Sequence, residues 1–136
     1  MKSHARRLLC IVRPNPKWWL GIVLALIVQS SFAQAPTEVE TILNKMLSAM
    51  QTGSLEEFSA AGDASFKAAM TKELLNGVSA QVGSRLKEGY TSTFLGTVKQ
   101  QGYVIYLWRL EFKDGKDDRL VTMPVKDGKV GGFFLR

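Results

Sequence analysis

Two hydrophobic periodicities divide the chain beyond residue 36. From Thr37 to Val82, apolar residues recur at the three- and four-residue intervals of a helix that buries one face. From Tyr90 onward they alternate with polar residues, which is the pattern of strands with one buried face. Because the helical pattern comes first and does not return, the sequence predicts a single α+β domain.

The helical half is divided by glycines and capping residues. Its first segment has one apolar stripe, formed by Val39, Ile42, Leu43, Met46, Leu47 and Met50. Thr37 and Glu40 have the spacing of a capping box at the start of this helix, and Gly53 is placed to end it. Ser54 and Thr71 are positioned to cap two further helices. The buried face of the helix after Thr71 is formed by Leu74, Leu75, Val78 and Val82.

The second half predicts four strands, near residues 90–100, 103–112, 118–125 and 130–135. The turns at Gln101-Gly102, Asp114-Gly115 and Asp127-Gly128 are short, so consecutive strands must pair antiparallel as a meander. One face of the second strand must pack on the helices, because it is formed by Val104, Tyr106, Trp108, Leu110 and Phe112. Gly131 and Gly132 predict a bulge or sharp bend in the last strand.

The opposite face of the predicted sheet is also apolar. Alternation along the strands assigns to it Leu95, Ile105, Leu107 and Leu120, together with Thr91, Thr93, Thr97 and Thr122. Soluble monomers rarely leave a large contiguous apolar patch uncovered. We therefore expect a homodimer whose interface contains the four aliphatic residues.

A basic and then apolar segment precedes the domain, in the order of an export signal. Its cationic residues are Lys2, Arg6, Arg7, Arg13 and Lys17, and an apolar run from Trp18 to Val28 follows. As a helix, this run would be only about 16 Å long, against about 30 Å of membrane hydrocarbon. The sequence therefore predicts a signal peptide and a periplasmic or secreted protein, with an uncleaved membrane anchor as the alternative.

Two overlapping small-residue cleavage sites end the leader, at Ala33 and at Ala35. Cleavage after Ala33 is favoured, because a cut after Ala35 would leave Pro36 beside the scissile bond, where its locked φ and missing N–H hinder an extended substrate. The prediction is a signal peptide over residues 1–33 and one domain over residues 34–136.

Removal of the leader changes the charge and the available chemistry. The whole sequence has 18 Lys and Arg residues and 12 Asp and Glu residues, which gives a net charge of +6. The leader holds five of the cations and no acid. Without it, 13 cations and 12 acids remain, and the net charge is +1. Nucleic-acid binding therefore loses its electrostatic support. Cys10 and His4, the only cysteine and histidine, also lie in the leader, so Ser-His-Asp and Cys-His catalysis are excluded and zinc is disfavoured. No metal or cofactor is expected.

Carboxylates are the remaining candidates for chemistry. Asp63 follows Gly62 and has the residue type of a general base, but a cap of the helix over residues 64–70 is the favoured interpretation. Asp114, Asp117 and Asp118 have the density of a calcium site, although the cations interspersed among them favour a solvated, charged loop.

Aromatic and cationic strand residues are candidates for ligand binding. Tyr90 and Tyr106 have hydroxyls that could orient a polar ligand, and Trp108 could stack on one, against the alternative that all three belong to the core. Arg109 could bind a ligand carboxylate, but its position in a strand beside Glu111 favours a cross-strand ion pair on the outer face of the sheet.

A resemblance to a known superfamily rests on the order of the elements and on three short motifs. These motifs are Gly53 to Phe58 with Gly62-Asp63, Phe66 to Leu75, and Val125 with Asp127 to Phe134. With them the chain resembles the nuclear transport factor 2-like, cystatin-like superfamily, and in particular a group of bacterial exported domains sometimes found upstream of α/β-hydrolase domains. The resemblance implies a cone, in which N-terminal helices close against a curved four-stranded antiparallel meander and leave a pocket. Sheet-to-sheet dimers are common in that superfamily.

The resemblance implies a fold with a pocket but does not specify a function, since the superfamily includes enzymes, carriers and structural partners. Its enzymes commonly pair an Asp with a His or Tyr, and no His remains beyond the leader. We therefore interpret the chain as an exported, non-enzymatic domain that binds an apolar or amphipathic small ligand or a protein partner. The alternative is a cofactor-free isomerase or hydrolase that uses Asp63 and a tyrosine hydroxyl.

Overall fold

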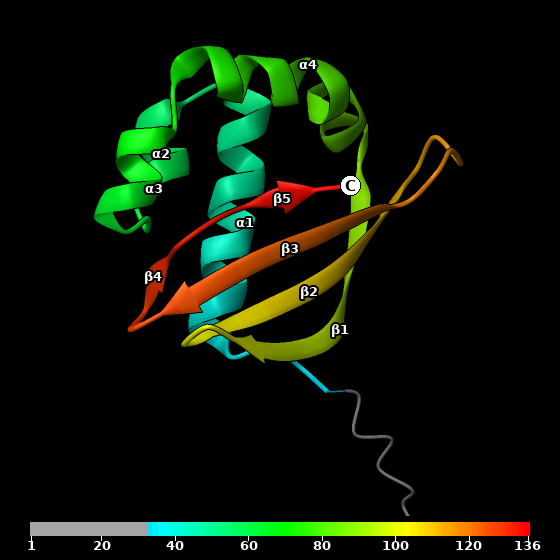
Figure 1. Cartoon of the computed structure of the whole chain (residues 1–136). Coiled ribbons are helices and arrows are strands. Elements are labelled where there is room, and N and C mark those ends of the chain that lie inside the picture. Colours follow the sequence, from blue (N-terminus) through cyan, green and yellow to red (C-terminus); the bar gives the residue numbers. More distant parts are fainter. Residues whose placement is uncertain (1–32) are drawn as a thin grey trace, which may run out of the picture. The chain divides into compact units, whose positions relative to one another are not determined.

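The computed structural model describes residues 33–136, so the predicted signal peptide lies outside the described residues apart from its last position. Helices α1 (Thr37–Thr52), α2 (Leu55–Ser59), α3 (Ala64–Ala69) and α4 (Lys72–Glu88) come first. Strands β1 (Tyr90–Gln100), β2 (Tyr103–Phe112), β3 (Arg119–Lys126), β4 (Lys129–Val130) and β5 (Phe134–Leu135) follow (Figure 1). The predicted α+β organisation, with N-terminal helices before an open antiparallel sheet, is confirmed.

Three helix N-termini and one C-terminus are fixed by the residues that the sequence predicts. The side chains of Ser54, Asp63 and Thr71 accept hydrogen bonds from backbone N–H groups in the first turns of α2, α3 and α4, at 3.3, 2.7 and 3.3 Å. Gly53 ends α1 in the left-handed conformation, with φ of 71°. Each of these contacts is local, because a capping side chain bonds a donor only three residues away.

The capping box predicted at Thr37 and Glu40 is wrong. Pro36 precedes the first helical residue, and α1 has no side-chain cap. The Glu40 carboxylate instead accepts a hydrogen bond from Nε1 of Trp108 at 3.2 Å. A buried indole needs an acceptor for its N–H, and only the packing of α1 on β2 brings the two residues together.

The first three strands pair in sequence order, as predicted, and the predicted fourth strand is two short strands that both pair with β3. Gln101 and Gly102 both have positive φ, as do Asp127 and Gly128, which is the conformation of a tight two-residue hairpin. The bend predicted at Gly131 and Gly132 separates β4 from β5. A Cβ at Gly131 would lie only 2.5 Å from the ring of Tyr103, so any other residue there would require that ring to shift.

The core lies between α1 and the inner face of the sheet (Figure 1). Trp108 and Leu110 of β2 and Val121 and Met123 of β3 are fully buried. They pack with the apolar stripe of α1, formed by Val39, Leu43, Met46, Leu47 and Met50. The predicted inner face of β2 is therefore confirmed.

A β-bulge in β1 changes the composition of the outer face. The register shifts between Phe94 and Gly96, so Leu95 and Gly96 together oppose Leu107. Beyond the shift, Thr97 pairs with the inward Tyr106 and Val98 pairs with the outward Ile105. The assignment of Thr97 to the outer face is therefore wrong, and a valine takes the position.

Residues of β3 and β5 extend this outer face. Pro124 pairs with Ile105, and Phe134 pairs with Thr122, so both belong to the same side as Leu107. The side chains of Leu95, Val98 and Phe134 remain about half exposed. We use the name outer apolar face for the surface formed by Leu95, Val98, Ile105, Leu107, Leu120, Pro124 and Phe134.

Candidate functional site

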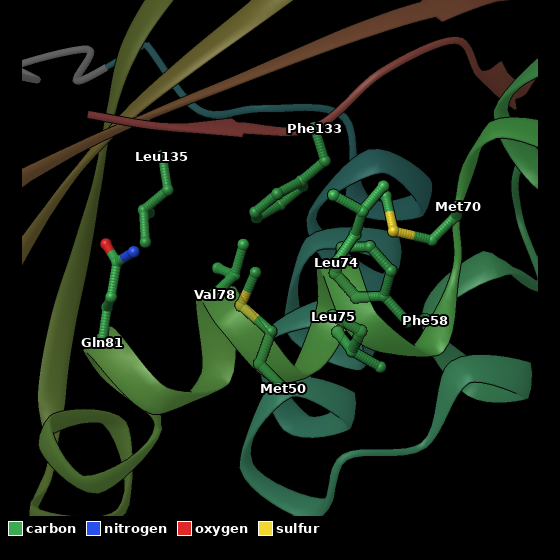
Figure 2. Close-up of a pocket in the computed structure, with 9 residues that line it drawn as sticks. All are labelled: Met50, Phe58, Met70, Leu74, Leu75, Val78, Gln81, Phe133 and Leu135. Atoms are coloured by element: carbon green, nitrogen blue, oxygen red, sulfur yellow. The ribbon is translucent and has the colours of Figure 1, made fainter.

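An apolar pocket with a volume of about 320 Å³ lies between α4 and the C-terminal segment (Figure 2). Its lining side chains come from helices α1, α2 and α4, from the α3–α4 junction, and from the chain around β5. They are Met50, Phe58, Met70, Leu74, Leu75, Val78, Gln81, Phe133 and Leu135. Eight of these nine residues are apolar, so the pocket suits an apolar group rather than an ion.

Local sequence features create the two walls of this pocket. Leu74, Val78 and Gln81 lie four and three residues apart on α4, which puts them on one side of the helix. On the opposite wall, Leu135 pairs with the inward Val121 of β3. Figure 2 shows the Phe133 and Leu135 side chains extending from this wall toward α4.

Aromatic contacts join two of the residues that line the pocket. Phe58 lies edge-to-face with Phe133, with ring centroids 5.5 Å apart, and it also contacts Phe66 at 6.0 Å. Leu74, in contrast, is 55% exposed. An apolar side chain that α4 leaves in solvent beside a cavity gives a ligand further surface to cover.

The pocket offers binding rather than acid–base chemistry. None of its lining side chains is charged, and Gln81 is the only one with a strong hydrogen-bonding group. A bound molecule could therefore transfer apolar surface out of water and make one amide hydrogen bond. No lining side chain has the chemistry of a general acid, a general base or an activated nucleophile.

Asp63 lies outside the pocket, at the N-terminus of α3. Its Oδ1 accepts a hydrogen bond from the Phe66 N–H at 2.7 Å, and its own N–H donates to the Val130 carbonyl at 2.8 Å. This is the capping arrangement that the sequence favours. The side chain is thus bonded to the backbone of α3, and no tyrosine lines the pocket beside it.

The predicted ligand-binding aromatics also lie away from the pocket. Trp108 is fully buried, and its ring stacks on that of Tyr106 with centroids 5.9 Å apart and lies 5.6 Å from Phe94. Tyr90 is half-buried at the start of β1, and desolvation raises the pKa of its hydroxyl. The structure brings Tyr106 and Trp108 together, but neither they nor Tyr90 line the cavity.

Sequence reasoning missed the residues that do form this cavity. The sequence pattern places Leu74 and Val78 on one face of a helix, but it assigns that whole face to the hydrophobic core. Phe133 and Leu135 follow the Gly-Gly bend, which was a usable signal, because a chain that turns after two glycines can direct the next side chains into a new environment.

A cluster around Arg85 corrects the interpretation of the acidic loop. The guanidinium of Arg85 donates to both carboxylate oxygens of Asp114, at 2.6 and 3.0 Å, and to the Asp117 carbonyl at 2.9 Å. It also lies 3.9 Å from the ring centroid of Phe112. The solvated loop expected from the sequence is therefore wrong for Asp114, because a cation from α4 reaches it. Mainly through the Arg85 hydrogen bond, the pKa of the Asp114 carboxyl falls to about 2.

Asp117 and Asp118, the other two acids of the charged loop, are exposed. Arg109 donates to Glu111 of the same strand, β2, at 2.9 Å and lies 3.9 Å from Asp118, which precedes β3. Its closest ion pair therefore forms within one strand, and not across strands as expected. Within residues 33–136, no three His, Cys, Asp or Glu side chains come together in a way that could hold a metal ion.

The Arg85–Asp114 pair predicts a pH-dependent contribution to stability. Because the pKa of Asp114 in the folded protein is about 2, below its ordinary value of 3.8, this contribution is present above pH 3.8 and is lost as the pH falls through about 2. Asp114→Asn is therefore expected to lower the melting temperature by a few degrees at neutral pH and by much less in strong acid. Thermal unfolding of both proteins, followed by circular dichroism over this range, measures the effect. A difference that persists unchanged in strong acid would contradict the assignment.

Comparisons of the chain with protein-family models, with curated proteins and with solved structures found no match. Among the described residues, no helix combines the length and the apolar character that crossing a membrane requires.

Proposed function

We propose that residues 34–136 form an exported, non-enzymatic binding domain that takes up an apolar or amphipathic group in the pocket between α4 and β5. The observation that carries this proposal is an uncharged cavity of about 320 Å³ with a single amide among its lining groups. If binding buries about 200 Å² of apolar surface, the gross gain is about 5 kcal/mol, from which the cost of association is subtracted. Such a balance favours moderate affinity and exchange of the bound group.

Export is supported by the leader, whose basic segment precedes a short apolar run and two small-residue cleavage sites. A periplasmic or secreted location follows from it. Binding is favoured over catalysis, because the Asp63 carboxylate is engaged with the backbone of α3 and no tyrosine lines the pocket.

The cone described for nuclear transport factor 2-like proteins is part of this proposal. Its support here is the bulge in β1, which bends a strand, together with helices that cover one face of the sheet and leave a cavity beside β5. The two-residue β5, which among the described strands pairs with β3 alone, lets that cavity remain open at the margin of the sheet.

Filling the pocket tests its use. Val78→Trp introduces a large ring at a half-buried position of α4 that lines the cavity. The naphthylamine dye N-phenyl-1-naphthylamine, which fluoresces strongly in apolar surroundings, is expected to bind the unmodified protein and to bind this variant at least about tenfold more weakly. Fluorescence titration measures both affinities.

Ala80→Trp is the matched control, because Ala80 is exposed on the same helix and does not line the pocket. The control should bind the dye as the unmodified protein does. Equal dye affinity in both tryptophan variants, or no dye binding to any of the three proteins, would overturn the pocket as the binding site.

The outer apolar face supports a second proposal, that two copies of the domain associate through their sheets. The centre of this face, around Ile105 and Leu107, is uncharged, and the nearby Arg109 is already paired with Glu111. A two-fold interface brings the same patch together from both copies, so an uncharged centre avoids like-charge repulsion. Leu95, Val98 and Phe134, each about half exposed, would lose much of their contact with water.

A further inference from the structure

Within residues 33–136, strand β5 is hydrogen-bonded to the sheet on one side only. Phe134 and Leu135 pair with Thr122 and Val121 of β3, and no other described strand pairs with β5. At the end of this ladder, Leu120 and Arg136 exchange both of their backbone hydrogen bonds, at 2.8 and 3.0 Å. Because bonding alternates along an antiparallel strand, the N–H and C=O of Leu135 point away from β3.

The neighbouring strand β4 does not share this free edge. The Val130 N–H donates to the Ala61 carbonyl at 2.9 Å, and the Val130 carbonyl accepts from the Asp63 N–H at 2.8 Å. The chain between α2 and α3 therefore covers the sheet margin at β4. The uncovered part begins beyond the Gly131-Gly132 bend, at β5.

The free edge of β5 and the apolar pocket occupy the same place in the fold. Phe133 and Leu135 form one wall of the pocket, and Leu74 and Val78 of α4 lie across from them (Figure 2). The edge of β5 therefore faces α4 across the apolar pocket. The opposite edge of the sheet differs, since a bulge interrupts β1 and no β1 residue lines the pocket.

We infer that the pocket and the edge of β5 together bind an extended peptide segment, which adds a strand beside β5 and inserts alternate apolar side chains into the cavity. This inference rests on the proposed binding function of the same pocket and specifies its partner. A strand presents its backbone N–H and C=O groups to an edge and directs every second side chain to one face, as Phe133 and Leu135 themselves do. A small lipid would fill the cavity but leave the peptide groups of Leu135 without a strand partner.

The lining also restricts the peptide. Since no lining side chain is charged, the residues that enter the cavity must be apolar, and a charge at either position would be desolvated without a partner. The exposed Gln81 amide stands at the α4 wall and can bond the peptide backbone.

Backbone-modified peptides test the inference. The probes are fluorescein-labelled hexapeptides in which valine, leucine or phenylalanine alternates with threonine, each with a twin N-methylated at the residues that would face β5. With the purified chain, at least one probe is expected to bind by fluorescence polarisation, to displace N-phenyl-1-naphthylamine, and to bind at least about tenfold more tightly than its twin. The twin keeps every side chain and loses only donors to the strand edge.

A pair of protein variants at Leu135 tests the same hydrogen bonds by changing the protein instead of the peptide. Leu135→Pro and Leu135→Ala both remove the leucine side chain from the pocket, but only proline removes the outward N–H, which makes no bond to β3. Peptide affinity is expected to be about fivefold or more lower for the proline variant than for the alanine variant, and dye affinity about equal.

The outcomes separate the inference from the function on which it rests. Dye binding without peptide binding, equal affinity of a peptide and its methylated twin, or equal peptide affinity of the two Leu135 variants would overturn strand addition and leave the pocket standing. Failure of both dye and peptides to bind would overturn both. Peptide binding that N-methylation and Val78→Trp each weaken would support strand addition.

Discussion

Trp108→Ala is expected to lower the free energy of unfolding by about 3–5 kcal/mol, the range for removing a large aromatic side chain from a core. The indole is fully buried and packs against the rings of Tyr106 and Phe94 on the inner face of the sheet. Alanine would leave a cavity and would also leave the Glu40 carboxylate without its indole donor. Urea unfolding followed by circular dichroism measures the loss.

Trp108→Phe is the matched control, because it keeps an aromatic ring in the core but lacks the donor to Glu40. Its loss is expected to be about 1–2 kcal/mol, the share of one hydrogen bond and a small reduction in volume. An alanine variant no less stable than the phenylalanine variant would show that burial of the ring does not contribute as the structure indicates.

Leu107→Glu is expected to dissociate the proposed dimer into monomers. Leu107 opposes the bulge residues Leu95 and Gly96 on one side and Thr122 on the other, which puts it in the middle of the outer apolar face. Near a two-fold axis, each glutamate would lie close to its symmetry mate, and both would lose water on association. Sedimentation velocity at micromolar concentration measures the change.

Asn44→Glu controls for the added charge, because Asn44 is exposed on α1, away from the sheet. This variant should sediment as the unmodified protein does. A monomer for the unmodified protein, or a Leu107→Glu variant that remains dimeric, would rule out association through the outer apolar face.

Features that depend on neighbours in sequence could be predicted from the sequence. Ser54, Asp63 and Thr71 bond donors three residues ahead, and such contacts form wherever the helix that follows forms. The Gln101-Gly102 and Asp127-Gly128 turns are likewise marked by glycines, which adopt positive φ without strain. Strand alternation then identifies the inner face of β2, because its period needs no knowledge of the partner strands.

Features that depend on distant segments could not be predicted in this way. The bulge at Leu95 exchanges Thr97 for Val98 on the outer face, and nothing local in the alternation of β1 marks the extra residue. Glu40 lies near a capping position but bonds Trp108, and Arg85 bonds Asp114; these partners are 68 and 29 residues apart.

The pocket is the strongest case of such dependence. Leu74 and Val78 have the same helical periodicity as core residues. The sequence of α4 alone therefore determined that they share a face, but it did not determine which segment lies opposite that face. Only the tertiary structure decided that Phe133 and Leu135 stand opposite them without filling the space between. The physical reason is that a cavity depends on the separation of elements, which the packing of α4 and the shortness of β5 fix together, whereas periodicity specifies only the direction of each side chain.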